Sequence, residues 1–139
     1  MSRRVWLATT VEGLGSWLQA GQVPIAEGHA VTAALRAAWP DGNDEDWEYA
    51  VLLAAAEEAA ALLLAPGRRV VVVVEAASVT EKDGTSVTLD QPEAWRRVVA
   101  VHADPPDARV PPRAAAEDQP DLGWYAVQEV PQLLIDDHG

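Results

Sequence analysis

The amino-acid sequence predicts an α+β fold, a single compact domain over residues 1–139. We expect a mixed or mostly antiparallel sheet of about four to five strands, packed by one long helix and one or two short ones. Five consecutive valines at 70–74 are typical of a central strand buried on both faces. An alanine-rich segment at 43–64 has the periodicity of a helix. Short apolar segments between 86 and 102 are separated by turn residues, which favours a meander.

The bulk composition is that of an ordinary globular domain. A chain of 139 residues can bury roughly two-thirds of the surface that its unfolded form exposes. Hydrophobic residues make up 49% and charged residues 23%, which argues against wholesale disorder. No cysteine is present, so disulfides, thiolate metal ligands and a cysteine nucleophile are excluded. The N-terminal apolar stretch is too short for a signal peptide, and no apolar run is long enough to span a bilayer, so we expect a cytoplasmic protein.

The charge of the chain narrows the classes of partner. The formal net charge is -12, and nine of the ten basic residues are arginines, Lys82 being the tenth. The bias to arginine and alanine is typical of a GC-rich genome. Because an acidic surface repels phosphate backbones and anionic lipids, we expect neither nucleic acid nor membrane as a partner.

The N-terminal third should contain a strand and two short helices. The strand is expected at 5–8, and a helix at 11–21 follows Thr9 or Thr10 as its N-cap and ends at a glycine. Residues 23–25 form a connection. A second helix at 33–39 follows a threonine that can cap it and stops at a proline.

The long helix should begin at Asn43 or Asp44 and reach about residue 64. Acidic residues fill its first turn, where the helix macrodipole favours negative charge. The spacing i, i+3, i+4, i+7 predicts that one stripe faces the core. That stripe consists of Tyr49, Leu52, Leu53, Ala56, Ala60 and Leu63. The opposite side carries Glu57 and Glu58 among alanines, so it is small and partly apolar.

The second half should supply most of the sheet. Further strands are expected at 86–89, 97–102 and 124–127. The segment 104–120 is rich in proline and should lie on the surface, with one helical turn at 113–117. Pro131 opens a final short helix, and residues 136–139 form a polar tail.

Several segments together resemble a known family. They are VWLATT, AVTAALRAAWP, DEDWEYAVLLAAA, VVAVHAD and WYAVQEV, and they cover most of the chain. On these segments the chain resembles a family of small uncharacterised acidic proteins from actinobacteria. The family has no assigned activity, so the resemblance implies no catalytic residue. The chain departs from it in the short, proline-rich 104–120, where a longer acidic helix is expected.

Two motifs suggest ligands but lack the required spacing. The acidic stretch 41–46 fails the EF-hand pattern, because Asp46 and Leu52 stand where glycine and glutamate are needed. It is interpreted as a helix start, and no metal site is predicted. Gly13 and Gly15 resemble a phosphate-binding loop, but Leu18 takes the third glycine position and no GK[ST] follows. No cofactor is therefore expected.

His102 and Asp104 form the candidate chemical pair. Both stand at the end of a predicted strand, where a carboxylate beside an imidazole can tune a general base or a metal ligand. His29 could join them only through the fold. No serine in an elbow motif accompanies them. The alternative is that His102 is a structural histidine with satisfied hydrogen bonds. His138 is expected to be a solvated tail residue.

Tryptophan supplies the candidate partner contacts. The chain has six tryptophans and no phenylalanine, so most must fill the core. Trp39, Trp47 and Trp124 adjoin polar or proline-bearing segments, where a ring can stay partly exposed and contact a partner. The alternative for each is simple packing.

Two functional hypotheses follow. The first is a non-enzymatic interaction or regulatory domain that presents an apolar patch with an acidic rim to a protein partner, or to a second copy of itself. The second is a small ligand-binding protein or enzyme with a pocket near His102, Asp104 and His29. The first is favoured, and catalysis is not expected, because no complete catalytic motif is present.

Overall fold

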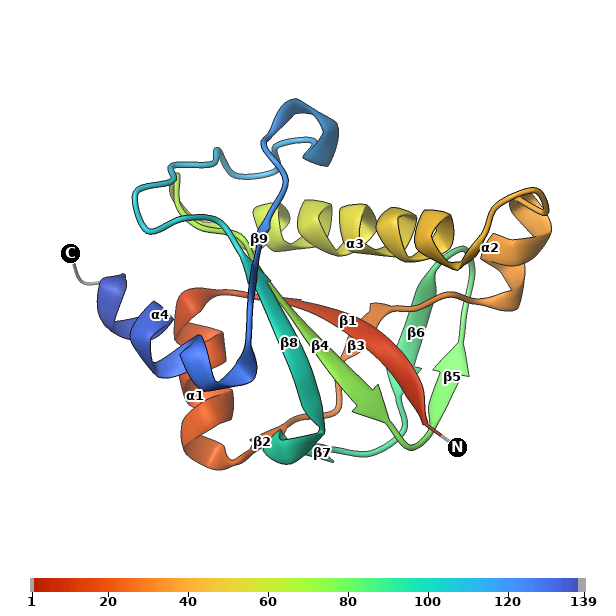
Figure 1. Cartoon of the computed structure of the whole chain (residues 1–139), viewed down its shortest axis with the longest axis horizontal. Helices are drawn as coiled ribbons and strands as arrows, with labels where there is room; N and C mark the ends of the chain where they lie inside the picture. The colour runs from red at the N-terminus through yellow and green to blue at the C-terminus, as the bar shows by residue number, and fades with distance from the viewer. Residues whose placement is uncertain (1, 138–139) are drawn as a thin grey trace.

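A seven-stranded sheet forms the centre of the computed structural model, which describes residues 2–137 (Figure 1). The strand order is β5-β6-β3-β1-β4-β8-β9, and every neighbouring pair is antiparallel. A separate two-stranded ribbon joins β2 (Gln22–Val23) to β7 (Glu93–Ala94). The strands of the main sheet are β1 (Arg3–Thr9), β3 (Glu27–His29), β4 (Val70–Ala76), β5 (Val79–Glu81), β6 (Ser86–Leu89), β8 (Val98–Ala103) and β9 (Gly123–Tyr125).

The prediction of four to five strands was wrong, because it lacked β3 and β5. Each of these strands has only three residues, too few for a recognisable hydrophobic pattern. In β3, the central Gly28 lies against β1. A Cβ at that position would be 2.6 Å from Leu7 Cδ2 and 2.9 Å from the Trp6 carbonyl oxygen. Close approach of two backbones therefore requires the residue that sequence reasoning treats as a strand breaker.

Residues 2–137 form four α-helices, one long and three short, so the prediction of one or two short helices was one too few. They are α1 (Val11–Ala20), α2 (Ala33–Ala38), α3 (Asp44–Ala61) and α4 (Val130–Asp136). The predicted caps are confirmed, since Thr10 and Thr32 accept hydrogen bonds from the backbone of Gly13 and Leu35. Asn43 and Asp46 form a reciprocal capping box at the start of α3. Single 3-10 turns add Trp95–Arg97, Ala116–Asp118 and Val127–Glu129.

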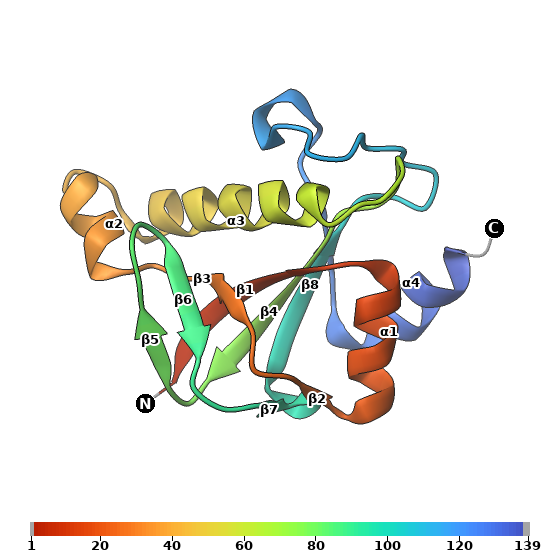
Figure 2. The same ribbon diagram turned by 180° about the vertical axis from the view of Figure 1, so that it is seen from behind.

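The helices divide between the two faces of the sheet. α1 and α4 lie together on one face and α3 lies on the other (Figures 1 and 2). The valines of β4 alternate accordingly. Val70, Val72 and Val74 belong to the core on the α1 and α4 side, whereas Val71 and Val73 belong to the core under α3. The predicted central strand, covered on both faces, is confirmed.

The face that α3 buries differs from the prediction by about one residue. Val51, Ala55 and Ala59 contact the sheet, whereas Tyr49, predicted to be in the core, is 50% exposed. The physical reason is size. A row of alanines lets the helix lie close to the sheet, so the larger side chains are displaced to its flanks. Of the predicted stripe, only Ala56 and Ala60 are fully buried.

The proline-rich segment lies on the surface and is anchored at several points. Val110 pairs with Gly67 in an isolated β-bridge, and the Arg113 amide donates to the Ala60 carbonyl. Ala116 is buried, at the start of a 3-10 turn that contacts α3. The helical turn predicted at 113–117 is thus formed slightly later.

The described residues end at position 137, one residue after α4. Of the predicted polar tail 136–139, positions 136 and 137 are exposed. His138 and the last residue lie outside the described residues. None of the helices within residues 2–137 combines the length and apolar character needed to cross a bilayer.

Candidate functional site

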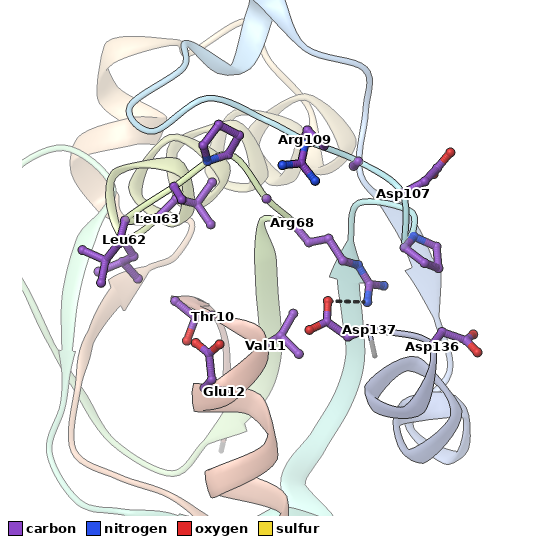
Figure 3. Close-up of a pocket in the computed structure, with 16 residues that line it drawn as sticks. Thr10, Val11, Glu12, Leu62, Leu63, Arg68, Asp107, Arg109, Asp136 and Asp137 are labelled. Atoms are coloured by element: carbon purple, nitrogen blue, oxygen red, sulfur yellow. Dashed lines mark hydrogen bonds and ion pairs between the residues drawn. The ribbon is translucent and has the colours of Figure 1, made fainter. Parts of the chain in front are cut away.

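A cavity with a volume of about 960 Å³ opens at one end of the sheet (Figure 3). It is bounded by the start of α1, the residues after α3, the loop 106–109 and the end of α4. Its charged lining residues are of both signs, namely Glu12, Asp107, Asp136, Asp137, Arg68 and Arg109. Both signs of charge line this cavity, and the described residues contain no group of side chains that could hold a metal ion. The cavity therefore does not indicate one class of ligand.

Arg68 explains the architecture at that end. Its Nε donates to the Asp104 carbonyl at 2.9 Å, and its Nη1 donates to the Leu133 carbonyl at 3.3 Å. A weak ion pair with Asp137 at 3.5 Å is drawn in Figure 3. The Nη2 atom is buried without a hydrogen-bond partner among the described residues. Arg68 therefore fastens α4 to the end of β8.

A smaller pocket of about 400 Å³ lies between α3 and the strands β8 and β9. Two rows of the sheet form its floor. Trp6 pairs with Val73, which pairs with Ala100. In the next row His102 stands directly opposite Trp124 on β9. Because residues in register share a face, this floor points toward the side on which α3 packs.

One flank of α3 forms the wall. Glu45, Glu48, Tyr49 and Leu52 all line the pocket, and their spacing of i, i+3, i+4, i+7 places them on one side of the helix. The neighbouring stripe of Val51, Ala55 and Ala59 holds the helix on the sheet. The flank thus overhangs the part of the sheet that α3 leaves uncovered.

A β-bulge supplies a further wall residue. Val73 pairs with Ala100 but Val74 pairs with Val98, so Val99 is the extra residue of β8. A bulge bends the strand and redirects a side chain that alternation would point away. Val99 lines the pocket and is partly exposed.

His102 lines this pocket. Burial lowers its pKa from the usual 6.5, because the protonated ring is less well solvated there. The ring is therefore neutral at neutral pH. Within the described residues it has no hydrogen-bonded carboxylate.

Asp104 lies elsewhere, at 2% exposure beyond the end of β8. Its carboxylate accepts from the Arg69 Nε at 2.8 Å and Nη2 at 2.7 Å, and also from the Arg69 amide. Arg69 also donates to the Pro120 carbonyl. This is a buried bidentate pair that joins two strand ends, so the structure separates Asp104 from His102.

His29 is not part of the pocket. It stands on β3, in the row of Trp6 and three strands away from β8, roughly 14 Å at the usual strand spacing. Its Nδ1 is 2.8 Å from Thr85 Oγ1 and its Nε2 is 3.1 Å from Glu58 Oε1. Both contacts tie α3 and the 85 turn to β3, which is a structural arrangement.

The three candidate tryptophans separate into two places. Trp39 and Trp47 pack at the corner of α2 and α3, where the Trp47 Nε1 donates to the Trp39 carbonyl at 3.0 Å. The Arg36 guanidinium lies 5.4 Å from the centre of the Trp47 ring. Trp124 lies instead in the pocket beside His102, 62% exposed.

Of the residues that line this pocket, sequence reasoning named only His102 and Trp124 as candidates, and it missed the others, among them Tyr49, Leu52 and Val99. The signal for two of them was present, because Tyr49 and Leu52 share a helical stripe with Glu45 and Glu48. A stripe of such mixed polarity is more typical of a boundary than of a core. No pattern identifies the bulge at Val99.

Comparisons with known proteins identify a family but no activity. The chain matches no curated protein and no solved structure at a significant level. A family model described as a family of unknown function, DUF6912, matches residues 3–134. This match includes every residue of the pocket between α3 and β8–β9. The chain therefore belongs to DUF6912, a family of unknown function.

Proposed function

We propose that this protein is a non-enzymatic interaction domain that binds a segment of a partner protein in the pocket between α3 and β8–β9. The observation that carries the proposal is the exposure of Trp124 and Tyr49 on two sides of a formed pocket. Burial of a large aromatic ring lowers the free energy, so a partly exposed pair of rings beside a pocket favours contact with another molecule.

The shape of the pocket favours an anchored contact. Its floor of Trp6, Val73 and Ala100 is already buried, so binding requires little rearrangement of the domain. One large side chain of the partner fits a volume of about 400 Å³. Interfaces commonly concentrate their binding energy in such buried anchors, and tryptophan and tyrosine are enriched among them.

Charge defines the partner. Glu45 and Glu48 stand at the α3 edge of the pocket, and within residues 2–137 neither takes part in a salt bridge or side-chain hydrogen bond. The net charge of -12 adds a long-range attraction for cations. The partner segment is therefore expected to carry a lysine or arginine beside its apolar anchor. This charge supports a protein partner over nucleic acid or a membrane surface.

The competing function is a small-ligand site or an enzyme with His102 as its polar group. One observation favours it, since His102 lines the pocket. Within residues 2–137 no carboxylate is hydrogen-bonded to His102, which weakens it, because Asp104 is held by Arg69 and His29 contacts Glu58 and Thr85. A general base needs an orienting partner, so binding without catalysis is the better-supported reading.

The composition of the chain supports a setting for this function. A cysteine-free, arginine-rich and alanine-rich chain fits a reducing cytoplasm in an organism with a GC-rich genome. We therefore place the protein in the cytoplasm of an actinobacterium as part of the same proposal.

The test is selection of binding peptides from a random display library on the wild-type domain, followed by calorimetry. The selected peptides should combine a large apolar residue with a basic one. Trp124→Ala should weaken their binding about tenfold or more, as expected for an interface hot spot. Ile135→Ala is the matched control, since Ile135 is equally exposed but lies on α4, away from the pocket.

Three results would overturn the proposal. Equal binding of the selected peptides to Trp124→Ala would place the contact elsewhere. Tight self-association in sedimentation that Trp124→Ala abolishes would make a second copy of the chain the occupant. Turnover of any small molecule that depends on His102 would replace binding by catalysis.

A further inference from the structure

The pocket between α3 and β8–β9 combines aromatic rings with carboxylates. Trp6, Tyr49 and Trp124 line it from β1, α3 and β9, and Glu45 and Glu48 stand at the α3 side. The face of an aromatic ring carries partial negative charge and attracts a cation, more strongly where water is excluded. Rings and carboxylates therefore favour the same occupant, a positively charged group.

The other titratable groups that line the pocket do not reverse this preference. The Arg4 Nε and Nη2 atoms bond to Glu75 Oε1 at 3.3 and 3.2 Å, so its charge already has a counter-ion. The Tyr49 hydroxyl donates to Asp121 Oδ1 at 3.2 Å, which raises the pKa of Tyr49 and keeps it uncharged. Burial lowers the pKa of His102, so that it too is uncharged at neutral pH. The sign of the pocket is thus set by Glu45 and Glu48.

The inner surface distinguishes between kinds of cation. Leu52, Val73 and Ala100 are apolar and offer side chains without hydrogen-bond acceptors. A primary ammonium has three N–H groups that must find acceptors when it leaves water, and the pocket offers carboxylate acceptors only on its α3 side, at Glu45 and Glu48. A trimethylated ammonium has none, and its methyl groups can contact the rings directly.

We infer that the side chain bound in this pocket is a methylated lysine of the partner segment. This inference rests on the proposed function and names its anchor. The four-carbon stem supplies the apolar part that Val99 and Leu52 can contact. The methylated head supplies the charge for the aromatic faces and for Glu48. One residue thus provides both the large side chain and the positive charge.

The test compares peptides that differ in one residue. A nine-residue peptide of glycine, serine and alanine carries at its centre trimethyl-lysine, lysine, or an uncharged isostere in which carbon replaces the ammonium nitrogen. Calorimetry and NMR of the indole N–H groups measure binding to the full chain. Trimethyl-lysine should bind about five- to tenfold more tightly than the isostere, the range expected for a partly desolvated cation over aromatic rings.

Matched variants assign the effect to this site. Glu48→Gln should reduce the preference for the cation over the isostere, whereas Glu57→Gln should not, because Glu57 is exposed on α3 and does not line the pocket. Trp124→Ala should abolish binding of all three peptides. Circular dichroism checks that each variant is folded.

The outcomes separate this inference from the proposed function. If the isostere or plain lysine binds as tightly as trimethyl-lysine, the methylated anchor is wrong but peptide binding stands. If free tetramethylammonium binds as tightly as the peptide, the occupant is a small cation and not a protein side chain. If the selected library peptides bind Trp124→Ala as tightly as the wild type, the proposed function fails as well.

Discussion

The two faces of the sheet are closed in different ways. On one face, aliphatic side chains of α1 and α4, among them Leu14 and Leu133, interlock with the valines of β4. On the other, α3 contacts the sheet mainly through alanines and a single buried valine. α3 therefore covers only part of its face, and Trp124 stays 62% exposed beside it.

This difference separates stability from binding. Large interlocked side chains exclude water and contribute most of the hydrophobic free energy. A helix that contacts the sheet through alanines buries less apolar surface per residue. Its flank nevertheless forms a fixed wall beside the part of the sheet that it leaves uncovered. We therefore expect substitutions on the α1 and α4 face to act on stability, and substitutions beside α3 to act mainly on recognition.

The largest effect on stability is expected at the buried ion pair between Arg69 and Asp104. Asp104→Asn leaves the Arg69 guanidinium without its counter-ion in a site that is almost fully buried. Breaking such a pair should lower the free energy of unfolding by about 3–5 kcal/mol. Urea denaturation measures this loss. A stable variant with impaired ligand binding would instead make Asp104 a functional residue.

A core substitution tests the closed face. Leu7→Ala removes a fully buried side chain from the α1 and α4 core and should lower the free energy of unfolding by about 2–5 kcal/mol. Leu52→Ala is its partner on the open face, half-buried and beside the pocket, and should have the smaller effect. Equal losses in urea denaturation would remove the distinction between the faces.

The start of α3 tests how firmly the pocket wall is held. Asn43→Ala removes one half of the capping box and should lower the free energy of unfolding by about 1 kcal/mol. Because the first turns carry Glu45 and Glu48, peptide binding should weaken as well. Thr10→Ala removes the cap of α1 with a similar loss of stability and should leave peptide binding unchanged.

The smallest effect concerns pH. In the folded state burial lowers the pKa of His102, whereas in the unfolded state it stays near 6.5. The unfolded chain therefore binds more protons below about pH 6.5, and the stability contributed by the neutral ring is lost as pH falls through the folded pKa. Denaturation of His102→Gln should show a shallower decline in this window than the wild type. Parallel curves would mean that the ring is protonated without penalty.

Much of the secondary structure is determined by local signals. Thr10, Thr32 and Asn43 cap the helices that their positions predict, because a cap needs only its own side chain and the next turn. The five valines of β4 predict a central strand, because a continuous β-branched run must be covered on both faces. The family match over residues 3–134 also follows from sequence alone.

The remaining features depend on contacts between distant residues. Only the fold shows that Asp104 turns to Arg69 while His102 faces Trp124, because a strand that ends between them no longer keeps alternate residues on one side. The choice of alanines over larger residues as the contact of α3 depends on how closely a helix can approach the sheet. The extra residue at Val99 follows from the register of two strands that are far apart in the chain. Local propensity determined the helices and the longer strands, whereas tertiary packing formed the short strands β3 and β5 and decided which side chains meet.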